Sequence, residues 1–106
     1  MNAYRVAILT PEKTEYEGRA VTLTVPGDNG LLTILAGHAP MVAVLAKGAV
    51  TVRTEHETLE GSIGSGLLRV GRNEAVMLVH GFEWAKNQGE TKAEDSEKAD
   101  ESRMML

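Results

Sequence analysis

The sequence predicts an all-β fold, an antiparallel sandwich or barrel of eight or more short strands. Up to Ala85, valine, leucine and isoleucine alternate with polar residues at a period of two, which is typical of half-buried strands. Glycine and proline interrupt this pattern about every ten residues, as the turns of such folds do. No convincing segment with a helical period precedes residue 85, so a parallel α/β fold is disfavoured.

The first half of the chain supplies four expected strands. Residues 4–8 alternate and end at the proline-containing segment 10–13. Residues 21–25 alternate apolar residues with threonine and end in a turn at Asn29-Gly30, where these residue types supply the positive φ angles that tight turns demand. Apolar strands are expected over residues 31–35 and 41–46, separated by the turn 36–40.

The second half of the chain supplies four more expected strands. Residues 50–52 alternate and lead into a polar hairpin tip at 54–58. Strands are expected over residues 59–63, 67–70 and 75–79, and the last two are joined by a turn at 71–74.

Composition divides the chain into one domain, residues 1–85, and a charged tail, residues 86–106. The tail has no valine or isoleucine. Glu94 and Lys98 have the spacing of a helical ion pair, which stabilises a helix by a few tenths of a kcal/mol. A single helix or a disordered segment is expected there. As one helix the tail would measure about 31 Å, too short for two packed helices and a turn.

Size and charge exclude several classes of function. The chain has 106 residues, a formal net charge of −4 and no cysteine. The charge disfavours a broad nucleic-acid surface, and the missing cysteines exclude disulfides and thiolate zinc sites. No apolar run approaches the roughly 20 residues needed to span a bilayer, and the N-terminus lacks a signal-peptide pattern. A soluble intracellular protein is therefore expected.

Two glycine-rich segments resemble catalytic motifs without completing them. Residues 66–73 come near a phosphate-binding loop, but Arg72 and Asn73 replace the required Lys and Ser/Thr, and a strand follows instead of a helix. Ser62 and Ser65 lie among glycines without the frame of a hydrolase elbow. We interpret the first segment as a hairpin and the second as a bend where strands change direction or pack closely.

Other reactive side chains are scattered. The three histidines have no partner at metal-ligand spacing, so a structural role is expected for each: His38, His56 and His80. Glu12, Glu15 and Glu17 cluster around an expected turn and are interpreted as solvated. Phe82 and Trp84 either close an edge of the core or mark a partner contact.

Three segments together resemble the N-terminal domain of the F-type ATP synthase epsilon chain, and the resemblance spans about residues 3–80. The first is Thr10-Pro11-Glu12-Lys13 with Tyr16-Glu17-Gly18. The second runs from Val25-Pro26-Gly27 through Gly30 to Gly37-His38-Ala39-Pro40. The third is Ser65-Gly66-Leu67-Leu68 with Val70, followed by the strand 76–79.

The resemblance implies a fold, a role and partners. The fold is an antiparallel β-sandwich of two sheets with about ten strands. The role is that of a non-catalytic rotor subunit without a cofactor, which links the gamma subunit to the c-ring on the cytoplasmic face of the membrane. By resemblance, the c-ring side is formed by Asp28, Asn29, Gly30 and Leu31, and the gamma side by Thr10, His38, Met41 and Ala43.

Two other functions stay open at this point. One is a free-standing sandwich that binds a small ligand or another protein. The other is a small esterase that uses Ser62 or Ser65 with His38 or His80. A contact between the tail and the alpha or beta subunit also stays open.

Overall fold

The computed structural model describes residues 2–85, and the prediction for the tail falls on residues outside this range. The described part of the chain forms ten strands and no helix. They are β1 (Tyr4–Leu9), β2 (Thr14–Ala20), β3 (Thr22–Gly27), β4 (Gly30–Leu35), β5 (Met41–Leu45), β6 (Gly48–Arg53), β7 (Thr58–Ile63), β8 (Gly66–Val70), β9 (Glu74–Val79) and β10 (Phe82–Trp84). The prediction of an all-β fold is confirmed.

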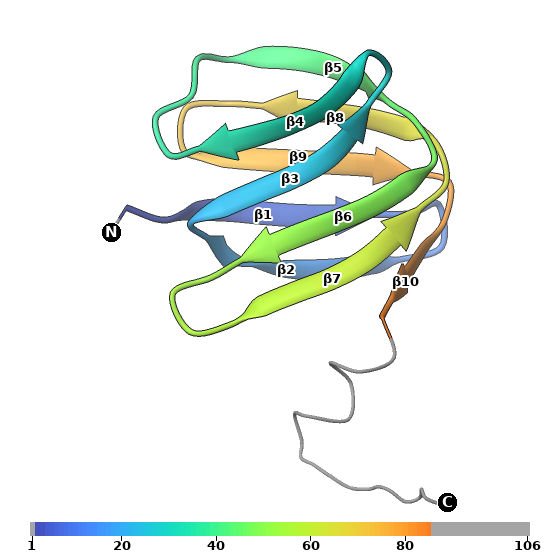
Figure 1. Ribbon diagram of the computed structural model, residues 1–106, viewed down its shortest axis with the longest axis horizontal. Helices are drawn as coiled ribbons and strands as arrows, with labels where there is room; N and C mark the ends of the chain where they lie inside the picture. Colours follow the sequence, from blue (N-terminus) through green and yellow to red (C-terminus); the bar gives the residue numbers. More distant parts are fainter. Residues whose placement is uncertain (1, 86–106) are drawn as a thin grey trace, which may run out of the picture.

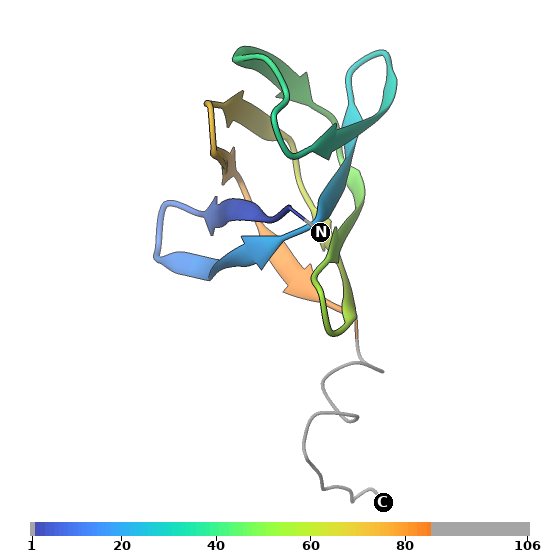
Figure 2. The same ribbon diagram turned by 90° about the vertical axis from the view of Figure 1, so that its left-hand side faces the viewer.

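The strands form two layers that face each other (Figures 1 and 2). One sheet has the order β4-β3-β6-β7-β10 and the other β5-β8-β9-β1-β2. A single bridge between Gly27 and Leu45 joins β3 to β5 and makes the two sheets continuous at one corner. The two-sheet sandwich implied by the resemblance is therefore present.

The core lies between the two sheets and is built by alternate residues of each strand. Val6, Leu23, Val52, Leu68 and Met77 are fully buried, and within residues 2–85 no charged side chain is buried with them. Removing a side chain of this size from water contributes about 1.5–3 kcal/mol, so these few residues hold a large share of the stability.

Two strands and one pairing depart from the sequence-based expectation. Strand β2 was not expected, and Glu15 and Glu17, which were placed around a turn, lie within it. Strand β10 was not expected either. Strand β1 pairs with β9 in parallel, although the expected fold was antiparallel throughout. Both missed strands lie at sheet edges, where one side of the strand is open to solvent and apolar alternation is weak.

The two glycine-rich segments have the structural roles predicted for them. Residues 66–73 form strand β8 and its turn into β9, with Gly66 paired to Val79 and Val70 to Ala75. Gly64 and Ser65 connect β7 to β8. Within residues 2–85, the structure contains no helix that could cross a bilayer.

Candidate interaction surface

Apolar side chains form a row across the outer face of the β5-β8-β9-β1 sheet. Val44 pairs with Leu67, Leu67 with Leu78, and Leu78 with the half-buried Leu9. Val44, Leu67 and Leu78 are 56%, 45% and 48% exposed. We call these four residues the apolar row. A contiguous strip of this kind on an outer sheet face is typical of a surface that a partner covers.

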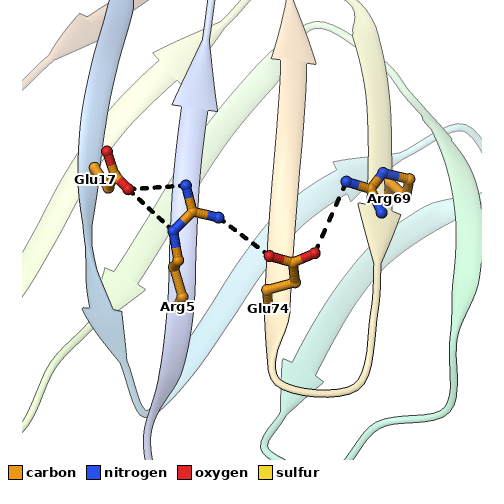
Figure 3. Close-up of polar contacts among 4 residues, drawn as sticks. All are labelled: Arg5, Glu17, Arg69 and Glu74. Atoms are coloured by element: carbon orange, nitrogen blue, oxygen red, sulfur yellow. Dashed lines mark hydrogen bonds and ion pairs between the residues drawn. The ribbon is translucent and has the colours of Figure 1, made fainter.

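A charged row lies on the same face as the apolar row, separated from it by the pair Ala7 and Val76. Figure 3 shows its four residues. The Arg5 guanidinium donates to Glu17 Oε2 at 2.8 and 3.0 Å, and to Glu74 Oε1 at 3.1 Å. Arg69 Nη2 lies 3.8 Å from Glu74 Oε2. The hydrogen bond to Glu17 and the charge of that carboxylate raise the pKa of Arg5, and Glu74 adds to the effect. The four residues span β2, β1, β9 and β8.

The charged row can orient a partner but adds little stability. Each of these side chains is at least 38% exposed, and exposed ion pairs contribute little because water and salt screen them. Their positions are fixed by the strand register, since Ala7 and Val76 pair next to them on β1 and β9. Fixed charges beside an apolar strip favour one orientation of a docked protein over others.

A hollow of about 370 Å³ lies between the β3–β4 hairpin and β5. It brings together the four residues expected to face the c-ring and two of those expected to face gamma. Its lining includes Asp28, Asn29, Gly30, Leu31, Met41 and Ala43. Leu31 is 75% exposed at the mouth, whereas Met41 and Ala43 are partly buried and pack against the core.

The other two expected gamma residues lie in turns. Thr10, between β1 and β2, donates from its hydroxyl to the Glu15 carboxylate at 2.9 Å. His38 follows Gly37, which has a φ of +82°, and its Nδ1 lies 2.7 Å from the Ala39 carbonyl oxygen. The β1–β2 turn and the β4–β5 connection lie at opposite ends of the sandwich (Figure 1). The structure therefore does not gather the four residues into one cluster, and their assignment stays a prediction.

The apolar row was missed by the sequence reasoning. Strand β5 is apolar at all five positions, so alternation could not tell which side chains point outward. The unbroken apolar run itself indicates an exposed apolar surface, because side chains of a strand alternate between its two faces. If Met41, Ala43 and Leu45 face the core, Val42 and Val44 must face away from it.

The groups expected in an esterase are not assembled. In the part of the chain that the structure describes, neither Ser62 nor Ser65 has a side-chain hydrogen bond to a histidine. The contact between Ser65 and His80 is a backbone bond, from the His80 N–H to the Ser65 carbonyl oxygen at 2.9 Å. Residues 2–85 also contain no group of three potential metal ligands.

A family model described as ATP synthase, Delta/Epsilon chain, beta-sandwich domain, matches residues 3–85. The chain belongs to this family. The resemblance to the epsilon chain drawn from three sequence segments is thereby confirmed.

ATP synthase epsilon chains of other organisms are similar in sequence to most of this chain. An ATP synthase epsilon chain of Ruminococcus albus is 31% identical over 97 residues, which cover 91% of this chain and 72% of the relative. An ATP synthase epsilon chain of Leptospira borgpetersenii is 36% identical over 77 residues, which cover 72% of this chain and 61% of the relative. The chain is therefore similar to only part of these proteins.

A solved structure shares the fold. A chain in the mitochondrial ATP synthase of Euglena gracilis, determined as an OSCP/F1/c-ring assembly, superposes with a TM-score of 0.71 at 18% identity. The match covers 74% of this chain and 51% of that one. At this identity the likeness concerns the Delta/Epsilon fold and not the details of a binding surface.

Proposed function

We propose that this chain is a non-catalytic central-stalk subunit of an F-type ATP synthase. It links the gamma subunit to the c-ring and supports the coupling of ion translocation to ATP synthesis. The observation that carries the proposal is the exposed apolar row in a member of the Delta/Epsilon family, because such a strip is typical of a surface that a partner covers.

The apolar row and the charged row suit a permanent contact with gamma. Long-lived interfaces are larger and more apolar than transient ones. The side chains of Val44, Leu67 and Leu78 project from three hydrogen-bonded neighbouring strands, so they are held in fixed positions before a partner arrives. Arg5 and Glu74 lie on the same face, and their charges disfavour any orientation of a docked gamma subunit that brings like charges together.

The β3–β4 hairpin suits a contact with the polar loops of the c-ring. Asp28 and Asn29 form its two-residue tip and are exposed, and Gly30 follows with a φ of +126°. Leu31 is 75% exposed directly after the tip. Under this proposal residues 1–85 form the domain that attaches to both partners, at the cytoplasmic face of the membrane.

The stiffness of the sandwich is what the proposed role requires. A connection between the ring and gamma transmits torque without loss when it does not yield, and hydrogen-bonded sheets with a packed core deform little. Thr10, His38, Met41 and Ala43 are proposed to extend the gamma contact beyond the apolar row. No step of chemistry is assigned to any of these residues.

Reconstitution of the stalk tests the role. The paired substitution Leu67→Glu and Leu78→Glu is expected to lower the affinity for purified gamma at least tenfold, because two charges would be buried in an apolar contact. The matched control is Ala49→Glu, which adds a charge at an exposed position of β6 on the other sheet. Circular dichroism checks that each variant is folded.

Two outcomes would overturn the proposal. One is that the unaltered chain has no measurable affinity for gamma. The other is that an ATP synthase assembled without the chain couples ion translocation to ATP synthesis as well as the complete enzyme.

A further inference from the structure

The sandwich has two sides where the edges of its sheets meet, and only one of them is closed by side chains. On the closed side, Trp84 of β10 contacts Tyr16 of β2, with ring centroids 5.5 Å apart. On the other side, β4 and β5 face each other across the hollow of about 370 Å³. Among the strands of residues 2–85, and apart from the bridge at Leu45, β5 pairs only with β8 and β4 only with β3. We call this open side the seam.

Backbone groups of β5 point into the seam. The Val44 carbonyl oxygen accepts a hydrogen bond from the Asp28 N–H at 3.0 Å, so it points away from β8. In an antiparallel pair, alternate residues direct their backbone groups to the same side. The N–H and C=O of Val42 therefore also point away from β8, toward the seam. Within residues 2–85, no hydrogen bond outside the strand ladders reaches them.

Strand β4 presents a second free edge by the same reasoning. Its hairpin closes at the pair Gly27 and Gly30, and Pro26, opposite Leu31, sends its carbonyl oxygen to the Ala46 N–H at 2.8 Å, away from β4. The backbone groups of Leu31, and of Thr33 two residues later, consequently point away from β3.

These two edges lack the charges that protect an edge strand. Natural edge strands carry charged side chains, which prevent pairing with another chain. The edge strand β2 carries Glu15, Glu17 and Arg19. In contrast, β4 and β5 contain no charged residue over the whole of Gly30–Leu35 and Met41–Leu45. Val42 is 67% exposed and Leu35 is 56% exposed, so the surroundings of the seam are apolar as well.

We propose that the seam binds an extended, uncharged strand of the partner that covers the apolar row. The strand pairs with the free edge of β5, and β4 forms the opposite wall of the site. An extended backbone is the occupant that matches alternating free N–H and C=O groups, and apolar side chains match the uncharged edges. Val44 belongs both to the apolar row and to the β5 edge, so a partner on the row continues directly into the seam.

The inference rests on the proposed function, under which the partner is gamma. The test therefore uses the whole chain with purified gamma. Val42→Pro removes the outward N–H and keeps an apolar side chain, and proline is tolerated on an edge strand when its nitrogen faces outward. The controls are Val42→Ile, which keeps the N–H, and Thr33→Pro, which removes an outward N–H from the facing edge.

The expected result is at least a tenfold weaker affinity for gamma with Val42→Pro, and less than a threefold change with Val42→Ile or Thr33→Pro. Equal affinity of Val42→Pro and Val42→Ile would overturn the inference, and so would a loss confined to Thr33→Pro. If the unaltered chain does not bind gamma, both the proposed function and the inference are wrong. If the unaltered chain binds gamma and Val42→Pro binds it equally well, only the inference is wrong.

Amide hydrogen exchange on the unaltered chain gives a readout that does not depend on the folding of a variant. In the free chain, the amide of Val42 is expected to exchange much faster than that of Ala43, which faces β8. In the complex with gamma, the Val42 amide is expected to become at least tenfold slower. An unchanged Val42 amide in the complex, or a dimer of the free chain that Val42→Pro dissociates, would overturn the inference.

Discussion

Tyr4 connects the two sheets through the core with a single hydrogen bond. Its side chain is 3% exposed, and its hydroxyl donates to the Ile34 carbonyl oxygen at 2.5 Å. Tyr4 lies on β1 and Ile34 on β4, so the bond joins opposite layers. Hydrogen bonds inside the core are shielded from competing water, which makes this contact more valuable than an exposed one.

Tyr4→Phe is expected to lower the free energy of unfolding by about 1–2 kcal/mol, because the ring stays packed while the bond is lost. Urea unfolding followed by circular dichroism measures the difference. A decrease below about 0.5 kcal/mol would contradict the structural role of the hydroxyl.

The same bond predicts a dependence on pH. Burial raises the pKa of Tyr4 from 10.0 to about 12, although a hydrogen bond with the backbone of Leu23 acts in the opposite direction. The folded state therefore favours the protonated hydroxyl, and its contribution is complete below pH 10 and lost as the pH rises toward 12. The stability difference between the unaltered chain and Tyr4→Phe is expected to be constant from about pH 7 to 9 and to shrink above about pH 10. A constant difference at all pH values would contradict the shift.

Gly66 lies where β8 passes closest to β9. A Cβ atom there would lie 2.8 Å from Val79 Cα and against the Leu78 carbonyl oxygen, both of them backbone atoms that cannot rotate away. Gly66→Ala is expected to destabilise the fold by about 1–3 kcal/mol. The control is Gly64→Ala, since its Cβ would have its nearest neighbour at 3.5 Å, and a change within about 0.5 kcal/mol is expected. Thermal unfolding of both variants distinguishes the two cases, and equal effects would contradict the close approach.

At the scale of elements, three aromatic rings close one side of the sandwich. Trp84 contacts Phe82 with ring centroids 4.6 Å apart, and it contacts Tyr16 on the other sheet. Both contacts are edge-to-face, the arrangement that the ring quadrupoles favour. The three-residue strand β10 is thus attached to β2 by side chains as well as to β7 by its backbone.

Trp84→Ala is expected to lower the free energy of unfolding by about 1–2 kcal/mol, because both ring contacts and part of the buried area are lost. Trp84→Phe keeps one ring and is expected to cost less than half as much. Circular dichroism in urea measures both, since the chain has one tryptophan and the variants lose its fluorescence. Equal stability of Trp84→Ala and the unaltered chain would show that the rings do not hold the sheets together.

The sequence predicted the strands with clear alternation and missed those whose alternation is interrupted. Residues 21–25 were located because their apolar side chains alternate with threonine, and residues 75–79 because they form a short apolar run after the turn 71–74. Strand β2 carries three charges and Gly18, so it looked like a turn, and only its pairing with β1 makes it a strand. The parallel pairing of β1 with β9 joins residues 69 positions apart, which no local pattern specifies.

The candidate surface was harder to predict than the fold. Residues 28–31 were singled out by resemblance and form an exposed tip, as the turn signal at Asn29-Gly30 indicated. The apolar row was not singled out, because Val44, Leu67 and Leu78 look like core residues in a sequence. Which side of a strand is buried depends on the sheet packed against it, and this is a property of the tertiary structure.

For the whole molecule, the topology predicts slow and cooperative folding. The contact between β1 and β9 can form only after a long loop has closed, and closing that loop costs conformational entropy. Folds with many contacts of this kind fold in milliseconds to seconds. Stopped-flow refolding, followed by Trp84 fluorescence, is expected to give one phase between about a millisecond and a second. Equilibrium unfolding is expected to be a single transition, because the two sheets share one core. Refolding in microseconds, or two separate transitions, would contradict this.

The position of β1 also matters while the chain is being made. Strand β1 lies between β9 and β2 in its sheet, so its second neighbour is translated only after 73 other residues have left the peptidyl transferase centre. Until then β1 lacks one of its two hydrogen-bonding neighbours, and an unpaired strand edge of this kind favours aggregation. Contact of chaperones with the nascent chain is therefore expected to last until Glu74–Val79 has emerged from the ribosome and can pair with β1.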